Sequence, residues 1–588
     1  MFSPGNIFVI FLLYLLLLFI GALLIEWKKE IAQKLVTNPV SYSLSFTVLF
    51  TAWTFYGNVG KAAVGNIYFL AFQVGAALSP MLWWIILRKM VILKQHYRIT
   101  SIADFLSLRY GRSHRVAGLA TIVAMLIIIP YISLQLKAIF ISFDATIIPG
   151  SMEMGGEYYR NFIIVVMIII FTLVIGVRRL DPTEQHRGMV MALVIESVVK
   201  LVALTALGIF VYFFFLGGFG NFSSVLENMD TELQGPAQPV MIGSYFTWFV
   251  YMLLAANAMI FLPRQFHVGV VENADDSHIK TAMWLIPLYV IALNIFVFPI
   301  AWGGLVSGIP VEKADSFMLL LPQVAGSRIL TLLVFIGGCS AGLGMIMISS
   351  MTLATMVSNH LVLPVLEWTP KMGSLRRYLL QYRWITVASV ILAAYLVETV
   401  IGEFFMLINI GVISFVATLQ FTPAAIGGLF WEKGNRVGTM LGISSGIVIW
   451  LYTMVLPAFI ESGVFSASIL SSGPLGISFL KPNALFGLTA LDPVCYAVFW
   501  SMLFNIVMYI LGAILYTENR DMAHNAYNIV HMVHDEFTPH EETQLAKDIP
   551  LSQKIPLLMN VLGRYLPDEK AERIINDTCR ELRIHENE

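Results

Sequence analysis

The chain has 588 residues, of which 58% are hydrophobic and only 12% are charged, whereas a soluble domain carries about 25% charged residues. A water-soluble protein this apolar could not cover its surface with polar groups, so the composition argues strongly against a cytosolic enzyme. The formal net charge of −1 provides no basic field for nucleic acid. The three cysteines, Cys339, Cys495 and Cys579, have no metal-ligand spacing and exclude a disulfide framework.

About thirteen stretches are long and apolar enough to cross a membrane as helices, since one crossing needs roughly 20 residues. No Lys or Arg precedes the first stretch, near 6–26, and no small-residue cleavage site follows it. We therefore interpret it as an uncleaved span rather than a signal peptide. The sequence predicts an all-α membrane protein whose later spans lie near 41–61, 66–92, 117–146, 161–178, 188–217, 244–262, 280–306, 327–358, 382–401, 404–430, 437–460 and 491–516.

The distribution of Lys and Arg predicts how these spans are oriented. With the N-terminus outside, the cytoplasmic loops hold 21 Lys and Arg and the exterior loops hold five, as the positive-inside rule requires. An odd number of spans then places the C-terminus inside. We expect a multi-pass protein of the bacterial inner membrane with the N-terminus outside and the C-terminus in the cytoplasm.

The composition changes at about Tyr516. Residues 517–588 are charged and almost free of aromatic side chains, and apolar residues recur at helical spacing from Leu557 to Leu566. We interpret this segment as a small cytoplasmic helical module, with a solvated tail as the alternative.

Small and polar residues interrupt two of the predicted spans. The second span ends with Gly57, Asn58 and Gly60 beside hydroxyl groups, and the seventh contains Asn257 followed by Leu262-Pro263-Arg264-Gln265. In lipid, unwound backbone persists only where it lines a cavity or is buried in protein. Paired interruptions in two halves of a transporter indicate a midplane binding site. Ordinary packing of small residues between helices is the alternative, with equal weight.

Three ionisable residues fall inside predicted spans, where charge is expensive and indicates function. Glu196 and Lys200 are four residues apart in the sixth span, so they share one helical face. Such a pair can be a structural clamp, which we favour, or can carry a proton. Lys137 lies mid-span in the fourth span and has no partner nearby in the sequence.

Several stretches resemble one family, the sodium/solute symporters, and most closely the symporter-like sensory modules joined to bacterial histidine kinases. A short stretch of the tail, 562–571, resembles the STAC domain that links such transporters to two-component kinases. The matching stretches cover roughly residues 40–440 and include Trp53 to Gly57, Ile102 to Phe105, Arg109 to Gly111, Pro130 to Lys137, His186 to Gly188, Glu196 to Lys200, Leu262 to His267, Ser340 to Asn359 and Pro423 to Trp431.

The resemblance implies a LeuT-type 5+5 inverted repeat. The chain would then divide into a leading helix and loop (1–40), an inverted-repeat transport core (41–430), two trailing helices (431–516) and the tail (517–588). The substrate would bind where the second and seventh spans break, flanked by the fourth, ninth and eleventh. The residues implied to contact it are Trp53, Tyr56, Gly57, Asn58, Tyr131, Gln135, Asn257 and Gln420.

The resemblance also implies a cation site, from which this chain departs. In sodium-coupled members, backbone carbonyls of the second span and neighbouring hydroxyls of the ninth hold the ion. The carbonyl positions fall on Thr47 and Phe50, but the hydroxyl positions fall on Leu343 and Gly344, which have no side-chain oxygen. Sodium requires oxygen ligands, by the same logic as calcium, so the site would be weak. A shift of three residues would bring in Ser340.

Two functions remain open. The first is a secondary transporter that imports a small organic solute, plausibly an amino acid, by alternating access. A sodium or proton gradient would drive it, with Lys137, Glu196 and Lys200 as candidates for proton coupling. The second is a solute sensor that signals through its tail to a histidine kinase or response regulator. No nucleotide, nucleophile or zinc motif occurs, so we expect no enzyme activity and no resident cofactor or metal.

Overall fold

The computed structural model describes residues 2–27, 34–65, 67–148, 156–176, 186–218, 245–368, 378–401, 407–461, 466, 468–489, 491–518 and 520–535, with three isolated positions beyond them. Clustering of contacts divides the chain into two compact units, Met1–Val530 and His531–Glu588. Most of the second unit, including the STAC-like stretch 562–571, lies outside the described residues. The helical module expected there therefore stays a prediction.

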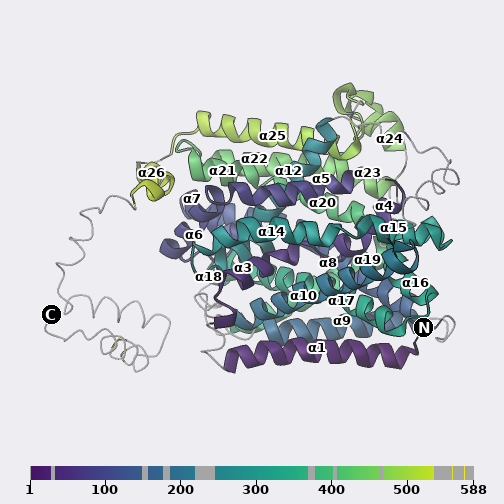
Figure 1. Ribbon diagram of the computed structural model, residues 1–588. Helices are drawn as coiled ribbons and strands as arrows, with labels where there is room; N and C mark the ends of the chain where they lie inside the picture. Colours follow the sequence, from purple (N-terminus) through teal and green to yellow (C-terminus); the bar gives the residue numbers. More distant parts are fainter. Residues whose placement is uncertain are drawn as a thin grey trace. The chain divides into compact units, whose positions relative to one another are not determined.

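Among the described residues the structure is helical throughout, and its one β-bridge is an isolated parallel pair between Phe2 and Ile147. The helices of the first half run side by side in Figure 1. They are α1 (Pro4–Trp27), α3 (Pro39–Phe46), η1 (Thr47–Leu49), η2 (Trp53–Gly57), α4 (Asn58–Ala63), α5 (Tyr68–Leu78), η3 (Ser79–Leu82), α6 (Ile86–Tyr97), α7 (Ile102–Arg109), α8 (His114–Thr146), α9 (Gly156–Gly176) and α10 (Arg187–Phe214).

The second half follows the same order of a broken span, further spans and short connecting helices. It consists of α12 (Tyr245–Phe261), α13 (Pro263–Phe266), η4 (His267–Val271), α14 (His278–Asn294), α15 (Val297–Val306), η5 (Val311–Ser316), α16 (Phe317–Val324), α17 (Arg328–Val357), η6 (Ser358–Val362), α18 (Leu363–Trp368), α19 (Leu379–Ile401), α20 (Leu407–Leu419) and α21 (Thr422–Phe430). Beyond it lie α22 (Arg436–Trp450), η8 (Leu451–Val455), α23 (Leu456–Glu461), α24 (Ser468–Ser472), three single-turn helices, α25 (Pro493–Leu515) and α26 (Arg520–Asp535).

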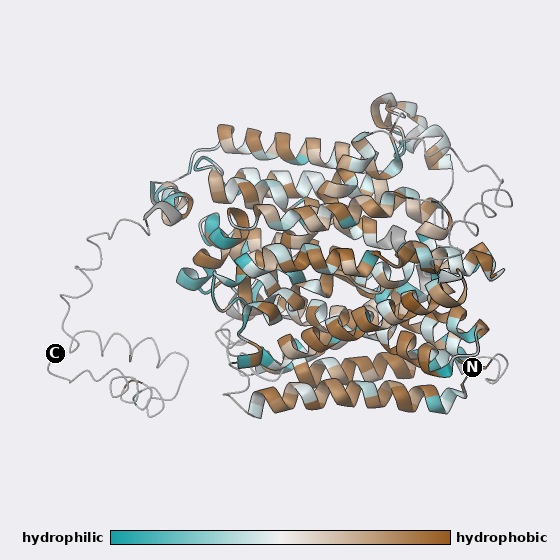
Figure 2. Ribbon diagram, in the orientation of Figure 1, coloured by the Kyte–Doolittle hydropathy of each residue, from teal (hydrophilic) through white to brown (hydrophobic). Residues whose placement is uncertain are grey.

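Twelve of the thirteen expected spans are present. Within the described residues, ten helices are long and apolar enough to cross a membrane, and two bent pairs bring the number to twelve. The bent pairs are α5 to η3 with α6, at 57°, and α12 with α13 to η4, at 48°. The remaining predicted span, 41–61, forms the four short pieces from α3 to α4, none long enough to cross alone. Figure 2 shows hydrophobic residues along the helices and hydrophilic ones gathered around α6 and α7.

Polar caps determine where several of these helices begin. The Asn38 side chain accepts a hydrogen bond from the amide of Ser41 (2.8 Å), just before a proline opens α3. The Asn435 side chain caps α22 in the same way, through the amide of Gly438 (2.7 Å). Such caps satisfy amide groups that the first helical turn leaves unpaired.

Small residues let particular helices approach closely. A Cβ at Gly75 would lie 2.2 Å from the carbonyl oxygen of Met252, so α5 and α12 touch almost backbone to backbone. On α22, glycines at 438, 442 and 446 are four residues apart and face α25. This small-residue stripe is typical of helix pairs in membranes, where close packing replaces the hydrophobic effect. It explains why the two trailing helices form a pair.

Candidate substrate and cation site

The two broken spans are linked to each other at their breaks. The first break lies at Phe50, whose ψ of 87° is not helical, and the second lies at Leu262, whose ψ is 132°. The Gln265 side-chain amide donates to the carbonyl of Phe46 (3.1 Å), and the Tyr42 hydroxyl donates to the carbonyl of Gly269 (2.8 Å). Each break leaves backbone carbonyls without their usual helical donors.

Lys200 supplies donors to the carbonyls freed by the first break. Its Nζ donates to the carbonyl oxygens of Thr47 (2.7 Å) and Phe50 (2.9 Å). These are the two carbonyl positions that the resemblance assigns to a cation. Lys200 is 4% exposed, so its ammonium group is buried at this point. The chain thus places the Lys200 amino group at the two carbonyls to which the resemblance assigns a cation.

Glu196 does not form the direct pair with Lys200 that their spacing indicates. Within the described part of the chain, no ion pair of 4.0 Å or less joins the two side chains. Glu196 instead extends toward α17, where a Cβ on Gly344 would lie 1.7 Å from its Oε2. Glycine at this position, where a hydroxyl is implied for sodium-coupled relatives, therefore makes room for the Glu196 carboxylate. Ser340 donates to the backbone carbonyl of Glu196 (3.1 Å).

An aromatic cluster lies beside the first break. The Trp53 ring packs edge-on against Phe415 (5.2 Å between centroids), and Tyr131 stacks on the other side of Phe415 (5.9 Å). Gln135, one turn after Tyr131 on α8, accepts a hydrogen bond from the amide of Ala52 (3.1 Å). Three of the predicted substrate residues, Trp53, Tyr131 and Gln135, are thereby brought together from different elements.

Arg264 joins this cluster, and the sequence-based reasoning did not select it. Its guanidinium carbon lies 4.4 Å from the centre of the Tyr131 ring. The residue is 1% exposed, and none of its three side-chain nitrogens has a hydrogen-bond partner among the described residues. A signal was present in the sequence, because Arg264 directly follows the proline that breaks the seventh span. The linear order alone placed it in a cytoplasmic loop.

The other predicted substrate residues point elsewhere. The Tyr56 hydroxyl contacts the hydroxyl of Ser142 (2.9 Å) and packs against α17. The Asn58 amide donates to Asn294 (3.2 Å), and Gly57 is the last residue of the π-helical turn η2. The remaining two are engaged with side chains of later helices: Asn257 accepts from Thr422, and Gln420 pairs with Ser501 and Asn505.

Lys137 lies toward the end of the membrane domain that carries η5. Its charge and that of Lys61 act on Asp315, a residue of η5 outside the candidate spans. Burial raises the pKa of Asp315 to about 6, although the two lysines oppose this shift. Asp315 lies about 180 residues after Lys137 in the sequence. It is therefore a charged neighbour of Lys137 that no local sequence pattern could reveal.

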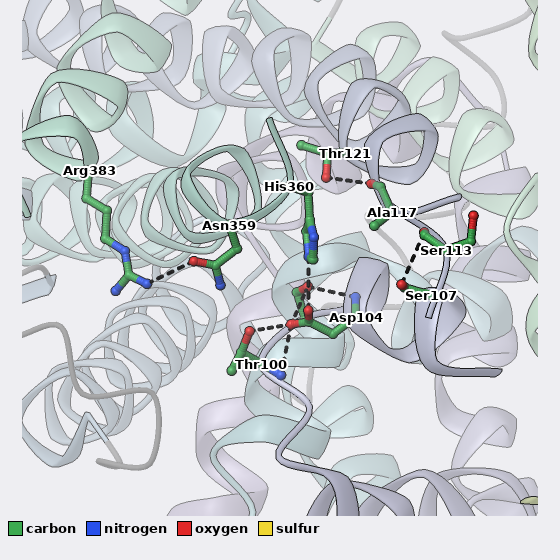
Figure 3. Close-up of polar contacts among 10 residues, drawn as sticks. Thr100, Asp104, Ser107, Ser113, Ala117, Thr121, Asn359, His360 and Arg383 are labelled. Carbon is green, nitrogen blue, oxygen red and sulfur yellow. Dashed lines mark hydrogen bonds and ion pairs between the residues drawn. The ribbon is translucent and has the colours of Figure 1, made fainter. Parts of the chain in front are cut away.

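At the opposite end, α7 is tied to the end of α17 (Figure 3). The Nε2 atom of His360, in η6, lies 3.0 Å from Oδ1 of Asp104. The other carboxylate oxygen accepts hydrogen bonds from the amide of Thr100 and the hydroxyl of Ser101, both at 3.1 Å. Burial alone would raise the pKa of Asp104, but the hydrogen bond and charge of His360 and the two hydroxyls hold it below its usual range.

A second polar cluster at this end joins α10 to η4. Glu272 Oε1 lies 2.8 Å from His186 Nδ1 and 3.1 Å from His267 Nε2. The three side chains are close enough together to hold a metal ion. In the structure they form an ion-pair network, which fixes the start of α10 against the second broken span.

A buried charge at broken helices, inside a bundle with paired interruptions, is the architecture of a secondary transporter. Comparison with solved structures agrees. A substrate-bound, outward-open Na+-coupled sialic acid symporter matches with a TM-score of 0.60 and 13% identity, over 87% of this chain and 98% of its own. The bundle therefore has the LeuT-type symporter fold.

Two curated relatives are similar to this chain, both from Bacillus subtilis (strain 168). The uncharacterized symporter YodF is 20% identical over 421 residues, which cover 68% of this chain and 76% of YodF. The uncharacterized symporter YhjB is 24% identical over 279 residues, which cover 46% of this chain and 52% of YhjB. No family model matches the chain. These findings support a multi-pass secondary transporter, and they do not support the expected link to a histidine kinase or a STAC domain.

Proposed function

We propose that this protein imports a small organic solute by alternating access and does not require sodium. The observation that carries the proposal is the position of Lys200, whose ammonium group binds both carbonyls expected to hold a sodium ion. Gly344 and Leu343, which replace the hydroxyl ligands implied for sodium-coupled relatives, supply no further side-chain oxygen. Two broken spans and an aromatic cluster beside the first break support the transport part of the proposal.

The expected repulsion between a sodium ion and Lys200 supports transport that does not require sodium. Two unit charges about 4 Å apart repel each other by roughly 4 kcal/mol at an effective dielectric constant of 20. A sodium ion at the Thr47 and Phe50 carbonyls would have to displace the Lys200 amino group from both of them, and in its charged form this group would repel the ion by about this energy. We infer that the driving ion is the proton, with Glu196, Lys200 and Lys137 as the residues to examine.

Uptake by proteoliposomes tests the proposal directly. The purified protein is reconstituted, and sodium and proton gradients are imposed separately with a panel of radiolabelled amino acids and small organic acids. We expect at least one solute to accumulate under an inward proton gradient, with the same rate when choline replaces sodium. Accumulation that needs sodium would contradict the proposed coupling. Binding of a solute without any flux would contradict transport itself and favour a sensor.

Lys200→Met removes the ammonium group and keeps the length of the side chain. We expect gradient-driven accumulation to fall by at least tenfold while the protein still inserts and elutes as a monodisperse peak. Lys313→Met, on the exposed surface of η5, is the matched control and should leave uptake unchanged. Normal uptake by Lys200→Met would reduce Lys200 to a structural residue.

A further inference from the structure

Arg264 and Arg109 are the most deeply buried arginines among the described residues, and they differ in their partners. Arg109 donates from Nε to the carbonyl of Gly428 (2.7 Å) and from Nη2 to that of Trp431 (2.9 Å). Arg264 is buried to the same degree, but Nε, Nη1 and Nη2 all lack an acceptor. A guanidinium group cannot lose its proton in a protein, so Arg264 remains charged.

The unpaired groups around Arg264 share one chemical property. Buried atoms without a partner in this cluster include Trp53 Nε1, Tyr131 Oη and Gln135 Nε2. The two nitrogens are donors, as are the guanidinium nitrogens, and the tyrosine hydroxyl can also donate. Buried polar groups in folded proteins are almost always satisfied, so a set of orphaned donors needs an explanation. A ligand rich in acceptors provides one.

We propose that Arg264 binds the carboxylate of the transported solute. The guanidinium group presents donors in a planar fork that matches a carboxylate in two parallel hydrogen bonds. The centre of the Tyr131 ring lies 4.4 Å from the guanidinium carbon and holds the fork by a cation–π contact. This inference rests on the proposed transport function, because the same broken spans form the site.

The charge of the cluster favours a carboxylate over a phosphate. Among the described residues of the cluster, Arg264 is the single cation, and its neighbours Trp53, Tyr131, Gln135 and Phe415 are neutral. A monoanion neutralises this charge, whereas a phosphate monoester would leave a negative charge buried among aromatic rings. The solute is therefore a carboxylic acid, a class that includes the amino acids, with the rest of the molecule near the rings of Trp53 and Phe415.

The thermal stability of the ligand-free protein is the first test, and it needs no knowledge of the solute. A buried charge without partners destabilises the fold, so its removal is expected to stabilise it. We expect Arg264→Met to raise the melting temperature in detergent by several degrees. Arg109→Met, the matched control, should lower it because two hydrogen bonds are lost. A fall with Arg264→Met similar to that of Arg109→Met would show a structural role and overturn the proposal.

Binding of matched pairs of compounds is the second test. Each amino acid and small carboxylic acid in a thermal-shift panel is compared with its primary amide, and inorganic phosphate is included as another anion. We expect stabilisation by one or more carboxylates and at least tenfold weaker binding of the corresponding amide. Arg264→Lys should weaken carboxylate binding by tenfold or more, and Arg264→Met should abolish it.

The outcomes separate this inference from the transport proposal. Equal binding of an acid and its amide, or preferential binding of phosphate, would overturn carboxylate recognition even if uptake is observed. Carboxylate binding that depends on Arg264 but is followed by no flux would overturn transport and leave the assignment of Arg264 intact.

Discussion

At the scale of single residues, the site depends on where the side chains of Lys200 and Glu196 on α10 point and on the space that Gly344 leaves on α17. Lys200 turns toward the carbonyls of Thr47 and Phe50, whereas Glu196 turns toward the gap left by Gly344. The helical spacing of Glu196 and Lys200 indicates that they share a face. It does not show that the broken span offers Lys200 better acceptors than the carboxylate does. Lys200 is connected to the break because it donates to two carbonyls there instead of pairing with Glu196.

Asp315 provides a prediction at the same scale. Burial raises its pKa to about 6, so its neutral form is favoured in the folded state. The associated stability is fully present below the unfolded pKa of about 3.9 and is lost as the pH rises through 6. Allowing for its partial exposure, we expect the wild type to lose about 1 to 2 kcal/mol between pH 5 and pH 7.5. Melting curves across this range measure the loss.

Asp315→Asn is the test variant, because the amide keeps the shape of the side chain and does not titrate. The difference in melting temperature between wild type and variant should change with pH around 6. Parallel curves would show that Asp315 is not the titrating group.

If Lys137 contributes to transport through this carboxylate, Lys137→Ala should reduce uptake and leave membrane insertion intact.

Whether the position of a residue in the site could be predicted depends on how far away in the sequence its contacts lie. The resemblance, rather than periodicity, named Trp53, Tyr131 and Gln135, and the structure brings them to the first break, with Trp53 on the π-helical turn η2 and the other two on α8. The direction of Gln420 is set by α25, about 80 residues further along the chain, so no local pattern reveals it. Arg264 was missed because a break in a helix changes the direction of every residue after it.

At the scale of elements, α7 connects parts of both repeats. Asp104, in its first turn, contacts His360 of η6, and Arg109, in its last turn, donates to the carbonyls of Gly428 in α21 and of Trp431 just after it. Its N-terminus is capped by Ser101, whose hydroxyl accepts from the Asp104 amide (3.1 Å). An eight-residue helix would not be stable alone, so these contacts hold it in place.

The contact between Asp104 and His360 can be measured by a double-mutant cycle. We expect Asp104→Asn and His360→Gln to show a coupling energy of about 1 kcal/mol in unfolding by SDS. The pKa of Asp104 lies below its usual range. Its contribution to stability is therefore present above about pH 4 and is lost as the pH falls through the depressed folded value.

The matched control combines Asp104→Asn with His96→Gln, because His96 contacts the carbonyl of Ile92 within its own helix. These two changes should be additive within about 0.5 kcal/mol. A cycle for Asp104 and His360 that is equally additive would contradict an energetic link between α7 and η6.

Element boundaries followed the sequence closely where a span is one continuous apolar helix, as in α8 and α17. They were less predictable where hydrogen bonding changes inside a span. The sequence predicts one span over 41–61, yet this stretch becomes a helix, a 3₁₀ turn, a π-helical turn and another helix. These changes depend on contacts from Lys200 and Gln265 that lie far away in the sequence.

At the scale of the whole membrane domain, the contacts between loops support the predicted alternation of the spans. Arg88 pairs with Asp276 (2.7 Å), and Lys94 donates to the carbonyl of Asn273 (3.0 Å), so the loops after the third and seventh spans meet. Arg109 joins the loop after the eleventh span. All three loops were assigned to one side from their Lys and Arg content. At the other end, Gln323 donates to the carbonyl of Ala145 (2.6 Å), as expected for two exterior connections.

These contacts establish which loops share an end, and the positive-inside rule then predicts that the α7 end faces the cytoplasm. Cysteine labelling tests this prediction in a background where the three native cysteines are replaced by serine. Glu312→Cys, exposed in η5, should react with a membrane-impermeant maleimide in intact cells, whereas His114→Cys, exposed at the start of α8, should react after permeabilisation alone. The reverse pattern would place Asp315 in the cytoplasm and Asp104 outside. Asp315 would then respond to the cytoplasmic pH and Asp104 to the external pH. A proton gradient that drives import would have to act from the other end of the broken spans.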